Sequence, residues 1–218
     1  MIEVLLNIKN YRNELEHLIT KVFVPAGHTI TKKIELDSVP ESVKYEALVF
    51  SLDNKNIVYR KGRVTPDRPG AYLAIWQRPY SPNMNGSKPI PIRCNEIDYL
   101  FVQVTRHCGG IDNEESIQDS NSGIFIFPVS LLIEKGIVSS EKSRGKTGFR
   151  VFPPWSQDRG VVGTKVFSDS GKKTQRWQLP YFLTIDENGL IDSCELNNLL
   201  KHDNVDSHAT YQSMASNV

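Results

Sequence analysis

The sequence has few cysteines, no long apolar run and almost no net charge. Its three cysteines (Cys94, Cys108 and Cys194) are far apart and form no Cys-x-x-Cys pair, which argues against a disulfide framework. No stretch approaches the roughly 20 apolar residues that span a bilayer. Residues 1–18 lack the basic start and uninterrupted apolar core of a signal peptide. These absences predict a soluble, cytoplasmic protein that has no membrane partner.

The formal net charge of +1 conceals local segregation of charge. Residues 55–93 contain eight basic side chains and one acidic one, whereas residues 95–119 contain six acidic side chains and one basic one. Residues 141–176 are basic again, with nine basic and three acidic side chains. Any binding of a polyanion must therefore depend on a local basic surface and not on the overall charge.

Hydrophobic periodicity predicts helices at both ends of the chain and strands between them. The expected helices cover residues 3–22, 38–52, 129–136, 169–178 and 192–201. The expected strands cover residues 28–34, 57–64, 71–78, 98–106, 123–127 and 148–152. Residues 57–64 and 71–78 are expected to form a hairpin, because a Pro- and Gly-containing turn separates them.

This order of elements predicts the α+β class, with a mixed central β-sheet flanked by helices. The length fits a single domain, which we expect to cover residues 1–203. The remaining residues 204–218 are polar and are expected to form a disordered tail.

Aromatic and basic residues alternate in the second half of the chain in a way that suits nucleic acid or a nucleotide. Guanidinium and ammonium groups neutralise phosphates, and flat rings stack on bases. The alternative for each tryptophan is simple core packing, and for each cation a solvated surface. The predicted binding residues are Arg60, Arg63, Trp76, Arg78, Arg150, Trp155, Lys173, Gln175, Arg176 and Trp177.

An alternative function is metal-dependent cleavage of phosphodiesters. Glu46 on the expected second helix, Asp67 after a proline in a turn, and Asp98 are the candidate carboxylates, and Mg²⁺ would be the cofactor. This order resembles the PD-(D/E)XK nuclease layout, but residues 74–77 lack the second carboxylate that such a site needs. We therefore expect binding without catalysis. The histidines are scattered, so the sequence predicts neither a metal site nor any other cofactor.

Four segments, in this order, resemble the MepB family of bacterial proteins. They are KNIVYRKGRVTPDRPGAYLAIWQRP, GIFIFPVSLLIEKGIVS, GFRVFPPWSQ and KKTQRWQLPYF, and the resemblance covers about residues 40–183. The positions shared with the family are Thr65, Pro66, Gly70, Trp76, Arg78, Phe127, Pro128, Gly136, Arg150, Pro153, Pro154, Trp155, Lys173, Thr174, Gln175, Trp177, Gln178 and Phe182.

The resemblance implies a fold similar to a restriction-endonuclease-like core that has lost its metal site, and it implies interaction with nucleic acid. The family pattern requires no acid at Asp67 and supplies no catalytic residue. The family takes its name from a gene beside a multidrug efflux pump. A third alternative is therefore a small-molecule binder that is linked to drug efflux.

Overall fold

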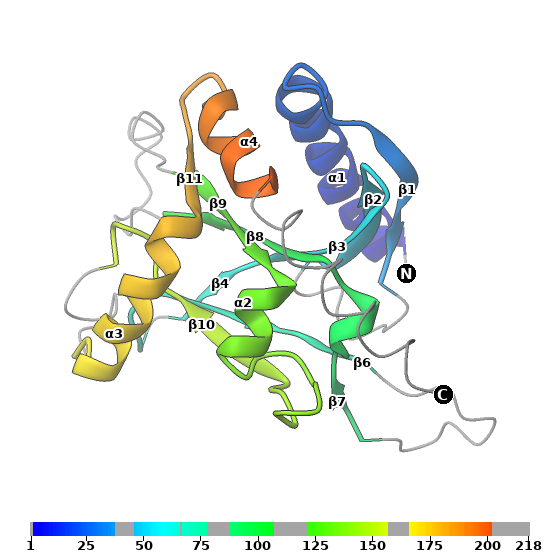
Figure 1. Ribbon diagram of the computed structural model, residues 1–218. Helices are drawn as coiled ribbons and strands as arrows, with labels where there is room; N and C mark the ends of the chain where they lie inside the picture. The colour runs from blue at the N-terminus through cyan, green and yellow to red at the C-terminus, as the bar shows by residue number, and fades with distance from the viewer. Residues whose placement is uncertain are drawn as a thin grey trace, which may run out of the picture.

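The computed structural model describes residues 2–37, 46–65, 67–77, 88–106, 122–156 and 166–201. A mixed sheet of six strands forms the centre of the fold (Figure 1). In spatial order, its strands are β1 (Ile30–Leu36), β2 (Leu48–Leu52), β3 (Lys55–Lys61), β8 (Tyr99–Thr105), β9 (Ser122–Pro128) and β11 (Phe182–Ile185). The pair β3–β8 is parallel, and the other neighbouring pairs are antiparallel. The predicted α+β class with a mixed sheet is confirmed.

Two helices cover one face of this sheet, α1 (Ile2–Leu18), which continues into the π-helical turn η1 (Ile19–Phe23), and α4 (Ser193–Lys201) (Figure 1). Alternate residues of each strand point toward them. In β8, Tyr99 and Phe101 join this first core cluster, whereas Leu100 and Val102 join a second cluster on the opposite face. The central strands are apolar on both faces because both faces are covered.

A third layer lies on the opposite face of the large sheet and carries most of the residues predicted to bind a ligand (Figure 1). It contains a three-stranded sheet in the order β10-β5-β4 and a strand pair β6–β7. Its strands are β4 (Arg63–Val64), β5 (Ala71–Ala74), β6 (Trp76–Gln77), β7 (Ile90–Pro91) and β10 (Gly148–Val151). Its helices are α2 (Val129–Glu134) and α3 (Asp169–Gln178), with the short 3-10 turns η3 (Cys94–Glu96) and η5 (Leu179–Tyr181).

Two sequence expectations are wrong. Residues 48–52 form strand β2 and not the end of a helix, because they pair with β3; residues 38–45 lie outside the described ranges. The expected hairpin is also different. The segment 57–64 changes sheets at Gly62, so that β3 belongs to the large sheet and only Arg63 and Val64 pair with β5.

The remaining helices and strands follow the sequence closely. Strand β8 is central, as its apolar character predicts, and Gly136, with φ of +61°, ends the turn after α2. Helix α3 begins as expected, but Ser168 is its N-cap, since its hydroxyl accepts a hydrogen bond from the Gly171 amide. In the described ranges no helix is long and apolar enough to cross a bilayer.

Candidate nucleic-acid interface

The three-stranded sheet places two of the predicted arginines on either side of a tyrosine ring. Arg63 of β4 and Arg150 of β10 are both register partners of Tyr72 in the middle strand β5. Directly opposed side chains in antiparallel strands point to the same face, about 5 Å apart at Cβ. The neighbouring residue Leu73 is buried in the second core cluster. The Arg-Tyr-Arg row therefore lies on the face that points away from this cluster.

Close contact between β5 and β10 sets the position of the tyrosine ring in this row. A Cβ atom at Gly148 would come within 2.3 Å of the Tyr72 hydroxyl oxygen. Only glycine therefore leaves room for the ring over β10. The ring consequently lies along the sheet surface beside Arg150, as a flat aromatic element of this face.

Arg150 also stabilises the turn between β4 and β5. Its Nη1 donates hydrogen bonds to the carbonyl oxygens of Pro69 (3.1 Å) and Gly70 (3.3 Å), and its Nη2 donates to the Thr65 hydroxyl. Burial, and then the charge of Arg68, lower the pKa of Arg150. Two guanidinium groups thus lie close enough to repel each other. A bound anion would relieve this repulsion.

Helix α3 is attached to the open edge of β10 through the side chain of Gln178. This side chain is completely buried. Its Oε1 accepts a hydrogen bond from the Phe152 amide (2.8 Å), and its Nε2 donates to the Arg150 carbonyl (2.9 Å). One turn earlier, Nε2 of Gln175 donates to the Pro153 carbonyl (3.0 Å). Gln178 therefore replaces a neighbouring strand at this edge, and Gln175 has a structural contact.

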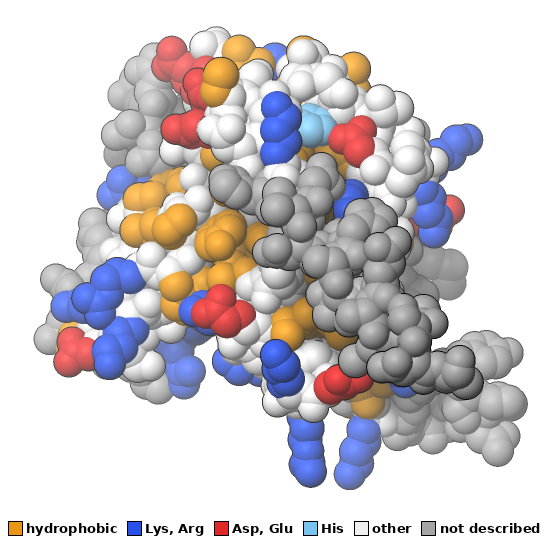
Figure 2. Space-filling model, in the orientation of Figure 1, with side chains coloured by type: hydrophobic (Ala, Val, Ile, Leu, Met, Phe, Trp, Pro, Cys, Tyr) orange, Lys and Arg blue, Asp and Glu red, His pale blue; other side chains and the backbone are white. Residues whose placement is uncertain are grey.

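The predicted cations of α3 are exposed. Lys173 and Arg176 are separated by three residues, so they lie near each other on the helix surface. Figure 2 shows basic side chains gathered over α3, beside an apolar patch toward α2. The described parts of β4, β5, β10 and α3, with their connecting segments 65, 67–70, 152–156 and 166–168, contain six basic and two acidic residues. This unit is the most basic part of the third layer.

The two tryptophans beside these cations are core-packed on one side and half-exposed on the other. The ring of Trp155 meets Phe182 edge-on at 5.5 Å between centroids. Trp177 lies 5.8 Å from Phe127, and the ammonium of Lys135 lies 5.7 Å from its ring centroid. The cation–π contact with Lys135 occupies Trp177, so a base would have to displace this ammonium group in order to stack there.

Arg60 does not lie on an accessible surface. Its side chain is 1% exposed and forms an ion pair with Asp37. Its Nε donates to the Ala74 carbonyl (3.1 Å) and its Nη1 to the Tyr59 carbonyl (2.8 Å). Burial lowers its pKa and the charge of Asp37 raises it. Arg60 therefore joins the large sheet to β5 inside the protein, and the prediction that it faces a ligand is not retained.

Of the two remaining predicted binding residues, Trp76 is half-buried in β6, where it pairs with Pro91 of β7. Arg78 lies outside the described residues.

The three candidate carboxylates do not form one site. Glu46 forms an ion pair with Lys61 (3.0 Å) at one end of β3. Asp98 accepts a hydrogen bond from the Asn56 amide (2.7 Å) at the other end, and the five residue steps from Asn56 to Lys61 span about 16 Å of strand. Asp67 is in the turn before β5, paired with the adjacent Arg68. Within the described residues, no group of three or more His, Cys, Asp or Glu side chains could hold a metal ion.

The predicted residues thus fall into groups, and only part of the set comes together. Arg63 and Arg150 share the outer face of the small sheet, and α3 brings Lys173, Gln175 and Arg176 to its edge. Sequence reasoning missed Tyr72 as a member of this face. Tyr72 is the half-buried residue between the buried Ala71 and Leu73 of β5, so its side chain points to the opposite face from theirs.

The positions that carry the family resemblance meet in this same unit. The turn residues Thr65 and Gly70 bind Arg150, whose strand binds Gln178 of α3. Gly70 has φ of +71°, and a Cβ there would come within 2.5 Å of the Val151 carbonyl. Only glycine fits this turn. Three motifs that are distant in sequence therefore form one connected hydrogen-bond network.

Comparison with known proteins identifies the family and a similar solved structure. The model of the MepB-like family matches residues 39–184. The solved structure described as the crystal structure of MepB superposes with a TM-score of 0.55 at 28% identity, and the match covers 72% of this chain and 87% of that one. A search of curated proteins finds no match. The family match spans the β4–β5 turn, β10 and all of α3, and it covers more than half of the sequence, so the chain belongs to the MepB-like family.

Proposed function

We propose that this MepB-like protein binds nucleic acid on the outer face of the β10-β5-β4 sheet and along the adjacent helix α3. The register that aligns Arg63, Tyr72 and Arg150 in one row carries the proposal. Two cations that flank a flat ring match a nucleic-acid strand, in which a phosphate lies on each side of every nucleoside and the base offers a face for stacking. The exposed Lys173 and Arg176 extend the basic surface beyond the sheet.

The electrostatics of this face favour an anionic ligand. Burial, and then the charge of Arg68, lower the pKa of Arg150. Asp67 opposes this change, but its exposed pairing with Arg68 contributes little free energy in water. A phosphate group placed between the two arginines would lower their mutual repulsion and accept hydrogen bonds from them.

The contacts of the three carboxylates favour binding over cleavage. Cleavage by Mg²⁺ requires carboxylates that converge on one ion. Glu46 and Asp98 contact opposite ends of β3, and Asp67 belongs to the other sheet layer. Glu46 and Asp98 therefore lie apart from the binding face, and Asp67 pairs with Arg68 beside it.

Fluorescence anisotropy with labelled single-stranded DNA, single-stranded RNA and duplex DNA tests this proposal. Five phosphate contacts, by Arg63, Arg68, Arg150, Lys173 and Arg176, predict a slope of about −3.5 for log K against log salt on single strands. Affinity should then fall about 130-fold between roughly 50 and 200 mM salt. The double variant Arg63→Gln/Arg176→Gln should reduce the magnitude of the slope by about 1.4.

The matched control is Lys32→Gln. Lys32 is an exposed strand lysine of β1, at the far edge of the large sheet, and its removal should leave the slope unchanged. A double variant whose slope equals that of the control would contradict phosphate contacts on this face. If the protein cleaves the same DNA in Mg²⁺ and Asp67→Ala abolishes the cleavage, its function is that of a nuclease and not binding alone.

A further inference from the structure

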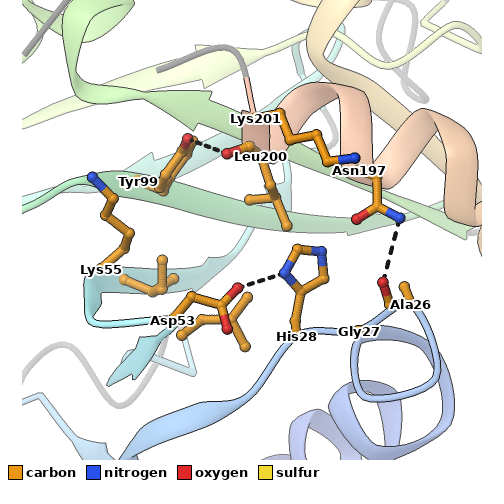
Figure 3. Close-up of a pocket in the computed structure, with 11 residues that line it drawn as sticks. Ala26, Gly27, His28, Asp53, Lys55, Tyr99, Asn197, Leu200 and Lys201 are labelled. Atoms are coloured by element: carbon orange, nitrogen blue, oxygen red, sulfur yellow. Dashed lines mark hydrogen bonds and ion pairs between the residues drawn. The ribbon is translucent and has the colours of Figure 1, made fainter. Parts of the chain in front are cut away.

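A pocket of about 410 Å³ lies in a different part of the molecule, between the first helical layer and the large sheet (Figure 3). It is formed by the segment after η1, the β2–β3 turn, β8 and α4. Its volume is within the range of small-molecule sites. Leu52, Ile57 and Leu200 provide apolar walls. Its polar and charged lining residues are His28, Asp53, Lys55, Tyr99, Asn197 and Lys201.

His28 is the distinctive residue of this pocket. Its side chain is only 10% exposed, and its Nδ1 lies 2.6 Å from Asp53 Oδ2. The other carboxylate oxygen of Asp53 accepts a hydrogen bond from the Thr29 amide (2.8 Å). Because Asp53 acts as an acceptor on both oxygens, we assign the imidazole proton to Nδ1. The carboxylate thus fixes both the tautomer and the orientation of the ring.

The second nitrogen of His28 has no partner in the described structure. Nε2 is buried and forms no hydrogen bond. In the neutral ring it presents a lone pair, and in the protonated ring it presents an N–H. A buried polar atom without a hydrogen-bond partner destabilises the folded protein. A ligand that reaches into the pocket and hydrogen-bonds to Nε2 would remove that destabilisation.

The charged groups of the pocket are mainly basic. Lys55 and Lys201 line it from opposite sides in Figure 3, and Asp53 is the acidic lining residue. The neighbouring polar groups support the walls of the pocket. The Tyr99 hydroxyl donates to the Leu200 carbonyl (3.1 Å), and Asn197 donates to the Ala26 carbonyl (3.3 Å). Both bonds attach α4 to the rest of the fold, so the pocket depends on a fixed helix.

We propose that this pocket binds a small organic anion that carries a phosphate or carboxylate group. The oxyanion is attracted by the ammonium groups of Lys55 and Lys201. A ligand hydroxyl, or the anion itself when the imidazole is protonated, forms a hydrogen bond with Nε2 of His28. The apolar part of the ligand packs on Leu52, Ile57 and Leu200. This site shares no residue with the proposed nucleic-acid interface.

The test is NMR of the ¹⁵N-labelled full chain, in which long-range ¹H–¹⁵N spectra report the His28 ring nitrogens. The probes are inorganic phosphate, ribose 5-phosphate and succinate, each compared with KCl at matched ionic strength, and uncharged ribose is the control for ribose 5-phosphate. We expect saturable shifts of the Nε2 signal with at least one oxyanion and none with KCl. The phosphate and carboxylate arms identify which group is preferred, and ribose 5-phosphate should bind more tightly than phosphate if the apolar walls contribute.

Lys201→Gln should weaken that binding about fivefold, because it removes one ion pair at a partly exposed site. Lys32→Gln, on the exposed side of β1, should leave the binding unchanged. Since Lys201 is exposed, its substitution leaves the fold intact. The proposal is overturned if the Nε2 signal responds to no probe, if uncharged ribose shifts it as much as ribose 5-phosphate, or if both lysine variants behave alike. None of these outcomes tests DNA binding, because the pocket shares no residue with the proposed nucleic-acid interface.

Discussion

Replacement of Gln178 by leucine should destabilise the protein strongly. Leucine fills a similar volume but removes both hydrogen bonds from Gln178 to the edge of β10, and thus leaves the Phe152 amide and the Arg150 carbonyl without these partners. Gln178 is completely buried, so water cannot replace them. Each buried group left unpaired costs roughly 1–3 kcal/mol. The free energy of unfolding should therefore fall by about 4 kcal/mol, which corresponds to a Tm lower by about 8–16 °C in a chain of this size.

Urea denaturation and thermal unfolding measure this change, and Gln175→Leu is the matched control on the same helix. Gln175 is half-buried and makes one hydrogen bond, to the Pro153 carbonyl. Its substitution should lower the free energy of unfolding by about 1 kcal/mol. An equal loss in the two variants, or a loss below about 1 kcal/mol for Gln178→Leu, would refute the inference that Gln178 completes the edge of β10.

Two further changes test the turn geometry and a buried hydroxyl. Gly70→Ala should lower the free energy of unfolding by at least about 1 kcal/mol more than Gly27→Ala. Both positions have positive φ, which costs an alanine about 1–2 kcal/mol, but a Cβ meets the Val151 carbonyl at Gly70 and meets no atom at Gly27. Equal losses of stability in urea denaturation would contradict this prediction. Burial, and then the charge of Glu46, raise the pKa of Tyr59 well above its ordinary value. The unfolded chain therefore releases this proton first, so stability falls as pH rises above about 10. Between about pH 9 and 11 the Tyr59→Phe variant should lose less stability than the parent protein. An identical dependence of stability on pH in the two proteins would contradict the raised pKa of Tyr59.

The predictions that agree with the structure concern helices and strands that short sequence segments determine by themselves. The amphipathic repeat predicts α1 and η1, and the proline and glycine at either end predict α2. The apolar strands β8 and β9 are recognisable because both of their faces are buried. The basic composition of α3 likewise predicts an exposed charged helix, and Lys173 and Arg176 are exposed on it. Each of these features depends on residues that are close in sequence.

The predictions that failed concern residues whose structure depends on contacts with residues distant in sequence. The sequence predicted a helix over residues 38–52, yet pairing with β3 makes residues 48–52 a strand. Alternation along β3 puts Arg60 on the same face as the buried Val58. It could not reveal that Asp37 and the Ala74 carbonyl occupy that space. A buried arginine and a ligand-binding arginine have the same local pattern.

The amino-acid order alone determined the fold class, most of the helices and strands, the basic character of the third layer and the family. These properties follow from periodicity and from motifs that short segments carry by themselves. Only the tertiary structure decided which cations share a face, since register across β4, β5 and β10 aligns Arg63 with Arg150. It alone brings His28 and Asp53 to one pocket with α4. Residues that are distant in sequence become neighbours through strand pairing and helix packing, which no local pattern encodes.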